Sequence, residues 1–327
     1  MSEIREIKLP QVPNVLKMKK TSLLIPFFVG FIATAVAGNV SELKSIKLIN
    51  KISQRADKYF IIETNSSDYK VVSTKLNTSK LYKKDSEIEL YNLKYENKLV
   101  LFSILPAKSK QNWVEVDIER ISQNVVKFPS LKQIVEEGFK EFDKSSGYNS
   151  LYIKRQDIRL VIKKNNRFFV AENCVTEYFN IIEQPLVFPN LMKNGYINIK
   201  SPVLSTKEFE SKYKAAYKEN SPNTLYLSAI GNTGLRRPLE KPLLFHSGNL
   251  NLFGYEAYKF WQFTDWPTID GPNYSRGIDR FVYVPELGII GGSFDAWFVS
   301  TSDDDLYSHY INEELLIPNS INDIRKY

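Results

Sequence analysis

Aromatic residues, arginines and carboxylates gather in the last third of this sequence, between Phe245 and Phe298. Within that region, residues 265–280 (DWPTIDGPNYSRGIDR) are rich in turn-forming types and run longer than most loops of compact domains. Long ordered loops with this composition are frequent recognition surfaces, and aromatic rings also stack on sugars. The candidate binding residues are Trp261, Asp265, Trp266, Asp270, Tyr274, Arg276, Asp279 and Arg280. A loop that covers a sheet edge, with its aromatic residues packed inward, would have the same composition.

A pair of carboxylates could support a different chemistry, hydrolysis. Asp117 and Glu119 are two positions apart next to an expected strand over 113–118, and residues two apart on a strand point to the same side. Glycosidases use two carboxylates separated by about 5–10 Å. The residues of this hydrolase alternative are Asp117, Glu119, Asp265 and Asp270, with His246 as a further titratable group. The simpler interpretation of Asp117 and Glu119 is a solvated strand face.

No complete catalytic motif occurs in the sequence. Gly291-Gly292-Ser293 resembles a nucleophile elbow but lacks the last glycine, and we expect a turn there between strands over 287–290 and 294–299. The acidic run 303–305 follows Ser302 and predicts the first turn of a helix that reaches about Leu315. With one Cys and two His, the chain cannot build a Cys-rich or three-His metal site. We therefore predict no metal and no cofactor.

Both strands and helices are expected to position these residues. Alternating patterns predict strands over 58–64, 69–73, 87–93, 98–105, 113–118, 151–154, 158–163, 167–171 and 224–229. Apolar stripes predict helices over 41–55, from an N-cap at Ser130 through Phe142, and from an N-cap at Ser205 through Tyr217. The many short connections between strands favour antiparallel pairing. We expect an α+β fold, mainly antiparallel sheet with several capped helices, in two lobes or domains.

Charge is distributed unevenly along the 327 residues. The whole chain carries 44 Lys and Arg against 37 Asp and Glu, a formal net charge of +7. Residues 38–218 hold 31 basic and 21 acidic groups, whereas residues 219–327 hold 8 basic and 14 acidic groups and are rich in glycine and aromatic residues. The shift predicts a boundary near 220. It separates a basic α+β lobe over 38–219 from an acidic lobe over 220–327 that ends in a helix.

The residues 18–37, MKKTSLLIPFFVGFIATAVA, have the pattern of a secretory signal peptide. Two lysines precede an apolar segment, and Ala35 and Ala37 occupy the positions that a signal peptidase requires before a cut after Ala37. The uncharged stretch is shorter than the roughly 20 residues of a membrane-spanning helix, so no stable membrane anchor is expected. Residues 1–17 fit a signal poorly and are expected to be an untranslated upstream extension. The predicted location is the periplasm.

These features together predict an exported binding protein without catalytic activity. Its partner would be another protein or a cell-wall-derived ligand, and an immunity or inhibitor protein against a periplasm-acting toxin fits the profile. The excess of positive charge is too small and too dispersed to favour nucleic acid. Cys174 is flanked by apolar residues and is expected to be a buried small hydrophobe. The alternative function is a hydrolase of cell-wall glycan or peptide.

Overall fold

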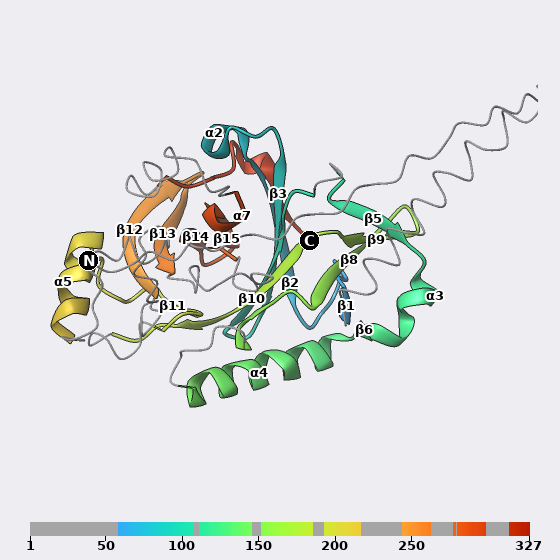
Figure 1. The fold of residues 1–327 in the computed structure, drawn as a ribbon, viewed down its shortest axis with the longest axis horizontal. Coiled ribbons are helices and arrows are strands. Elements are labelled where there is room, and N and C mark those ends of the chain that lie inside the picture. The colour runs from blue at the N-terminus through green and yellow to red at the C-terminus, as the bar shows by residue number, and fades with distance from the viewer. Residues whose placement is uncertain are drawn as a thin grey trace, which may run out of the picture. The chain divides into compact units, whose positions relative to one another are not determined.

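Three β-sheets organise the described structure (Figure 1). The computed structural model describes residues 58–107, 111–145, 152–185, 193–216, 244–262, 277–278, 280–298 and 314–327, all within one compact unit of the chain. Most neighbouring strands are antiparallel and few helices accompany them, so the α+β expectation is confirmed in outline. The predictions for 1–37, 41–55, the boundary near 220, the strand over 224–229 and most of 265–280 lie outside the described residues.

The first sheet has five strands in the order β5-β9-β8-β1-β6. Its strands are β1 (Lys58–Ile61), β5 (Trp113–Val116), β6 (Val125–Val126), β8 (Ile158–Lys164) and β9 (Arg167–Ala171). Strand β1 runs parallel to both of its neighbours, β6 and β8. The pairs β8–β9 and β9–β5 are antiparallel. Asn165 and Asn166 connect β8 to β9 with φ angles of 49° and 62°. A two-residue hairpin turn needs such positive angles, and asparagine tolerates them better than most residues.

The second sheet is central, because both of its faces are buried. Its path is β11-β10-β4-β3-β2-β16, and β7 also pairs with β10. The strands are β2 (Lys70–Asn77), β3 (Glu87–Tyr95), β4 (Lys98–Ile104), β7 (Lys154–Arg155), β10 (Cys174–Ile182), β11 (Tyr196–Asn198) and β16 (Ile324–Lys326). Along β4, Leu99 and Leu101 enter one core while Val100 and Phe102 enter the other. A strand buried on both faces has this continuous run of apolar residues.

The third sheet is an antiparallel meander of four strands that covers one face of the central sheet. Its strands are β12 (Leu244–Leu252), β13 (Tyr255–Gln262), β14 (Arg280–Val284) and β15 (Gly288–Ser293). Phe260 and Phe281 of this sheet share a core with Leu90 and Phe179 of the central sheet. Residues from before and after position 220 therefore build one core together.

A buried side chain ties the third sheet to the central one. Asn92 on β3 has no exposed surface; its Nδ2 donates to the carbonyl of Ile289, and its Oδ1 accepts from the amide of Ile289, both at 2.8 Å. The preceding residue, Gly288, has φ of +85°, and a Cβ there would lie 2.6 Å from Asn92 Oδ1. Glycine is thus required where this turn lies against Asn92 of the central sheet.

The helices are few and mostly short. They are α2 (Ser79–Tyr82), α3 (Ile118–Ile121), α4 (Phe128–Lys144), α5 (Thr206–Ala216) and α7 (Asp295–Phe298), with the 3₁₀ turns η1 (Ser122–Asn124) and η3 (Ile321–Asp323). Before α5, the Ser205 hydroxyl accepts from the Glu208 amide at 3.2 Å and the Glu208 carboxylate accepts from the Ser205 amide at 2.8 Å. These reciprocal bonds form a capping box.

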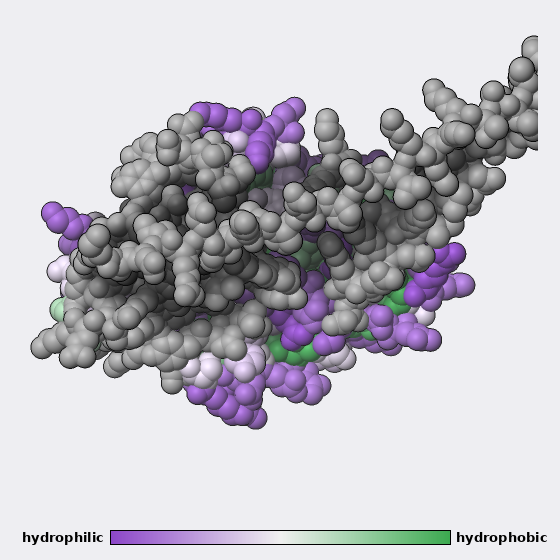
Figure 2. Space-filling view, viewed as in Figure 1, coloured by the Kyte–Doolittle hydropathy of each residue, from purple (hydrophilic) through white to green (hydrophobic). Residues whose placement is uncertain are grey.

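The longest helix, α4, begins earlier than the sequence predicts. Its N-cap is Lys127, and the expected cap Ser130 lies inside the first turn. The reason is Pro129, which the first turn of a helix tolerates because the amide hydrogen is not needed there. The expected apolar stripe is confirmed, since Leu131, Phe139 and other members pack against the central sheet. Figure 2 shows hydrophilic residues over the outer side of this helix.

The expected turn at Gly291-Gly292-Ser293 is wrong, because these residues belong to strand β15. A Cβ at position 291 would lie 2.5 Å from the carbonyl oxygen of Leu316, and one at position 292 would lie 2.5 Å from that of Arg280. The glycines therefore permit close approach of neighbouring backbone within a sheet instead of a reversal of the chain. The strand expected over 294–299 is likewise wrong, and α7 takes its place.

The helix predicted from Ser302 lies almost wholly outside the described residues. Its expected end is described, and Glu314 and Leu315 are not helical. Leu316 instead forms an antiparallel bridge with Gly292 at the edge of the third sheet. From there the chain continues through η3 to β16, which completes the central sheet beside β2.

Candidate functional site

An open cleft of about 1200 Å³ lies between the first sheet and strands β2 and β3 of the central sheet. One wall comes from the ends of β1 and β8 and the start of β9, with Trp113 of β5. The other wall comes from β2, β3 and the segment that carries Asp323, Arg325 and Tyr327. Pockets of this size hold small molecules or short chains.

The alternation of residues along two paired strands places the polar groups of the cleft. Ser73 and Lys75 project from β2, and Glu89 and Tyr91 project from β3, each pair two positions apart and hence on one face. The register pairs Ser73 with Tyr91 and Lys75 with Glu89 directly across the two strands. The sheet thus presents a row of two hydroxyls, an ammonium and a carboxylate on one surface.

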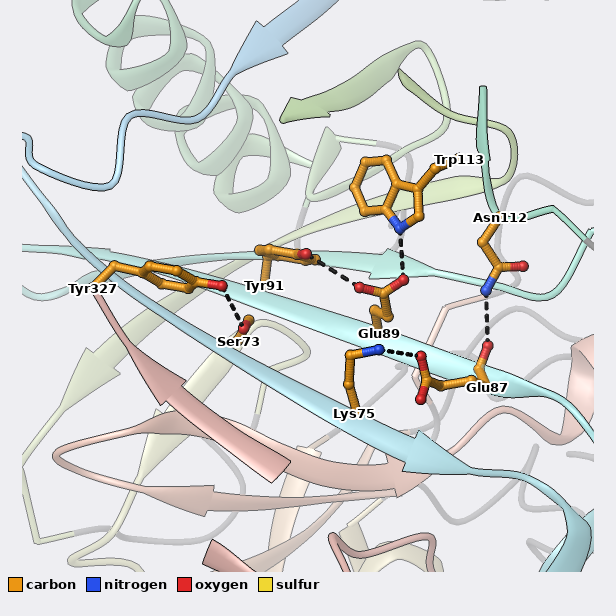
Figure 3. Close-up of polar contacts among 8 residues, drawn as sticks. All are labelled: Ser73, Lys75, Glu87, Glu89, Tyr91, Asn112, Trp113 and Tyr327. Atoms are coloured by element: carbon orange, nitrogen blue, oxygen red, sulfur yellow. Dashed lines mark hydrogen bonds and ion pairs between the residues drawn. The ribbon is translucent and has the colours of Figure 1, made fainter. Parts of the chain in front are cut away.

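Glu89 is the more buried of the two charged groups in this row, with 9% of the residue exposed. Figure 3 shows its two carboxylate oxygens, one facing Trp113 and the other facing Tyr91. Its Oε1 accepts from the indole Nε1 of Trp113 at 2.6 Å, and its Oε2 accepts from the hydroxyl of Tyr91 at 3.1 Å. The rings of Tyr91 and Trp113 meet edge to face, with centroids 5.9 Å apart. The carboxylate is therefore fixed in position by two donors from two different sheets.

The neighbouring groups share this electrostatic setting. Burial raises the pKa of Tyr91, and the adjacent Glu89 charge raises it further, so the phenol stays protonated and donates. Partial burial of Lys75 would lower the pKa of its ammonium, but the hydrogen bond to Glu87 and the charge of Glu89 outweigh burial, and the pKa is raised. The Lys75 Nζ lies 2.6 Å from Glu87 Oε1. Lys75 is thus a cation with a partner of its own.

The rim of the cleft is rich in cations. Five of the lining residues are basic and three are acidic. The Arg167 guanidinium pairs with Glu115 at 3.1 Å, and the Lys163 ammonium lies 5.7 Å from the centre of the Phe168 ring. Lys164 and Arg325 are exposed, and within the described residues neither forms an ion pair or a hydrogen bond through its side chain. These two charges are available to a ligand.

Asp117 and Glu119, the paired carboxylates of the hydrolase alternative, do not line this cleft. Strand β5 ends at Val116, two residues earlier than expected, and Asp117 caps α3 by accepting from the Glu119 amide at 3.0 Å. Both side chains are exposed. The expected strand face is therefore a helix start, because an aspartate followed by residues of helical propensity competes successfully with strand extension.

His246 is a buried residue of β12. Its Nδ1 lies 3.1 Å from the carbonyl of Ser201, and its Nε2 lies 2.5 Å from Asn249 Oδ1. Its ring stacks on Phe260. The imidazole joins the third sheet to the segment before α5 and does not line the cleft.

Of the eight residues predicted for the loop surface, the structure describes Trp261 and Arg280. They pair across β13 and β14, are 3% and 1% exposed, and lie with the guanidinium 5.4 Å from the ring centre. In the described structure both are packing residues of the interior. The prediction for Asp265, Trp266, Asp270, Tyr274, Arg276 and Asp279 falls outside the described residues and stays a prediction.

The two ends of that loop meet a buried ion pair. Lys154 Nζ lies 2.9 Å from Glu177 Oε1, and both side chains are 1% exposed. The other oxygen of Glu177 accepts from the amide of Ile278 at 2.8 Å, and Gln262 donates to Oε1 at 3.3 Å. Gln262 precedes the loop and Ile278 lies near its end, so one carboxylate holds both flanks. Nothing in the sequence pattern points to this arrangement.

Cys174 is buried at the start of β10 and carries a free thiol, as the sequence predicts. Burial raises the pKa of the thiol to about 11, so it stays protonated near neutral pH. In the described part of the chain, no three His, Cys, Asp or Glu side chains gather closely enough to hold a metal ion. No described helix has both the length and the apolar character needed to cross a bilayer.

Comparison with protein-family models, with curated proteins and with solved structures finds no match to this chain.

Proposed function

We propose that this chain is an exported binding protein that holds a cell-wall-derived ligand in the cleft above Glu89. The observation that carries the proposal is the buried carboxylate of Glu89, fixed by Trp113 and Tyr91 at the floor of an open cavity. Binding sites combine apolar and aromatic walls with a few placed polar groups, and this cleft has both. Aromatic rings beside hydrogen-bonding groups suit sugars and peptides alike.

The arrangement favours binding over the hydrolase alternative. Glycoside hydrolysis needs two carboxylates that face each other across a substrate. Asp117 is occupied as a helix cap, Glu119 is exposed beside it, and neither lines the cleft, whereas Asp265 and Asp270 of that alternative fall outside the described residues. Glu89 is oriented through both of its oxygens, which suits an acceptor that holds a ligand in place. The narrower prediction of an immunity or inhibitor protein has no described residue behind it and stays a prediction.

Binding in the cleft can be tested with soluble fragments of peptidoglycan released by a muramidase. We expect the purified protein to bind these fragments in a calorimetric titration. We expect Trp113→Ala to weaken binding and raise the dissociation constant at least tenfold. The substitution removes a donor to Glu89 and an aromatic wall of the cleft at once. The matched control is Tyr152→Ala, which removes an exposed aromatic ring outside the cleft. Equal affinity in both variants, or no binding by the unaltered chain, contradicts the proposal.

Export is the second part of the proposal and rests on the pattern in residues 18–37. We expect the chain recovered from the periplasm of a Gram-negative host to begin at Gly38. Terminal sequencing of the recovered protein measures this directly. Replacement of Ala37 by leucine removes the small residue before the cut, so this variant should accumulate as the longer precursor. A recovered chain that begins before Gly38 would show that the segment is not removed where the pattern places the cut.

A further inference from the structure

Negative and positive charges lie at different depths in the cleft, and this arrangement limits the class of ligand that can bind. At the floor lies one buried negative group, Glu89. At the rim lie Lys164 and Arg325, both exposed and, among the described residues, without an ion-pair partner. The carboxylates Glu63 and Asp323 also line the cleft, but basic lining residues outnumber acidic ones, and Asp323 takes part in the capping box of η3. A ligand that matches the buried carboxylate and the two exposed cations is positive at one end and negative at the other.

The floor has room for a further donor. An ionised carboxylate offers about four lone-pair positions. Within the described residues, Glu89 accepts one hydrogen bond from Trp113 and one from Tyr91 and no others. Both donors are neutral. The Lys75 ammonium lies across the two strands and interacts with the charge of Glu89, but its hydrogen bond goes to Glu87 at 2.6 Å. A ligand ammonium would therefore be the first cation hydrogen-bonded to Glu89 within the described residues.

The walls between floor and rim are aromatic. Tyr91 lies beside Glu89 on the wall formed by the central sheet, and Trp113 and Phe169 lie on the wall formed by the first sheet. Aromatic faces near a carboxylate attract an organic cation through the ring quadrupole as well as through charge. A ligand with only negative groups would instead bring its charge towards the buried carboxylate, which is unfavourable in a poorly solvated site.

We propose that the ligand is a short acidic peptide that enters the cleft by its free amino terminus. Its ammonium group binds Glu89, and its carboxylates bind Lys164 and Arg325 at the rim. An extended peptide advances about 3.3 Å per residue, so a cavity of about 1200 Å³ has space for a few residues. This inference rests on the proposed function, because it names the ligand class of the same cleft.

The test follows the indole N–H resonance of Trp113, which reports on its hydrogen bond to Glu89, during a titration with the peptide Ala-Glu-Ala-Glu. We expect this peptide to shift the resonance and to bind at least tenfold more tightly than its N-acetylated form. Replacement of both glutamates by glutamine in the peptide should also weaken binding, and added salt should reduce the difference.

Two protein variants separate the floor from the rim. Glu89→Gln keeps an acceptor for Trp113 but removes the charge, so it should abolish the preference for the free amino terminus. The double variant Lys164→Ala with Arg325→Ala should weaken binding of the acidic peptide. It should not affect folding, because both side chains are exposed and have no described partner. Glu141→Gln, on the outer side of α4, is the matched control for charge.

Equal affinity for the free and acetylated peptides overturns the inference, as does a preference that survives in Glu89→Gln. If neither peptide binds while peptidoglycan fragments do, the inference falls and the proposed function stands. If the peptidoglycan fragments do not bind and the free peptide binds through Glu89, the cleft is a peptide site. The proposal that its ligand comes from the cell wall is then wrong.

Discussion

Replacing Glu177 by alanine should lower the free energy of unfolding by about 3–5 kcal/mol. The carboxylate is 1% exposed and serves three partners, Lys154, Gln262 and the amide of Ile278. The Lys154 ammonium is close enough for an ion pair but lacks a well-aligned hydrogen bond within the described structure. Without Glu177 that ammonium would be buried with no counter-charge, and the amide of Ile278 would lose its acceptor. Urea denaturation followed by circular dichroism measures the change.

The double variant Lys154→Met with Glu177→Leu is the informative companion. It removes both charges together, so we expect it to be clearly more stable than Glu177→Ala, since no lone charge remains buried. The surface control is Glu141→Ala, which breaks an exposed pair with Lys144 and should change stability by less than about 1 kcal/mol. A loss for Glu177→Ala no larger than that of the control would show that the pair is solvated in the folded protein.

Replacing Asn92 by alanine should cost about 2–5 kcal/mol, because it leaves both backbone groups of Ile289 buried without partners. The side chain connects β3 to β15, which lie on opposite sides of the predicted boundary near 220. We therefore expect a single cooperative transition at a lower midpoint, measured by calorimetry and by fluorescence. Asn97→Ala, which removes an exposed bond to Asn180, should shift stability by no more than about 0.5 kcal/mol.

Two separate transitions in Asn92→Ala would contradict this expectation. They would indicate that the basic and acidic parts fold independently, as two lobes. One transition with an unchanged midpoint would show that water replaces the lost side chain between the two sheets.

Local features of this fold are readable from the sequence. The hairpin of β3 and β4 and the turn at Asn165-Asn166 follow from short-range patterns, since alternation and turn residues act over a few positions. The buried stripe of α4 is readable for the same reason, although Pro129 moves its start. Strand β15 is readable only in its first half, where a strand over 287–290 is expected, because Gly291 and Gly292 are set by close contacts with the backbone of Leu316 and Arg280.

The cleft was missed because its parts come from different sheets. A sequence signal did exist: Glu87 and Glu89 lie on the face of β3 that continues with Tyr91 and Leu93, so two carboxylates begin an otherwise apolar face. That pattern marks a buried acid that needs partners. It does not reveal that the partner is Trp113, which is separated from Glu89 by 24 positions and lies on another sheet. The predicted loop surface had composition in its favour, but its described members Trp261 and Arg280 are interior residues.

The pairing of β16 with β2 has a consequence for how the chain folds. Thr74 lies opposite Ile324, so the outer edge of β2 is completed by a segment synthesised about 250 positions later. Contacts over such separations slow folding, because the intervening chain must be ordered before they form. Until Ile324–Lys326 arrives, β2 presents unpaired backbone groups to any other strand. A chain interrupted before that point would keep this edge open and could pair with another copy of itself.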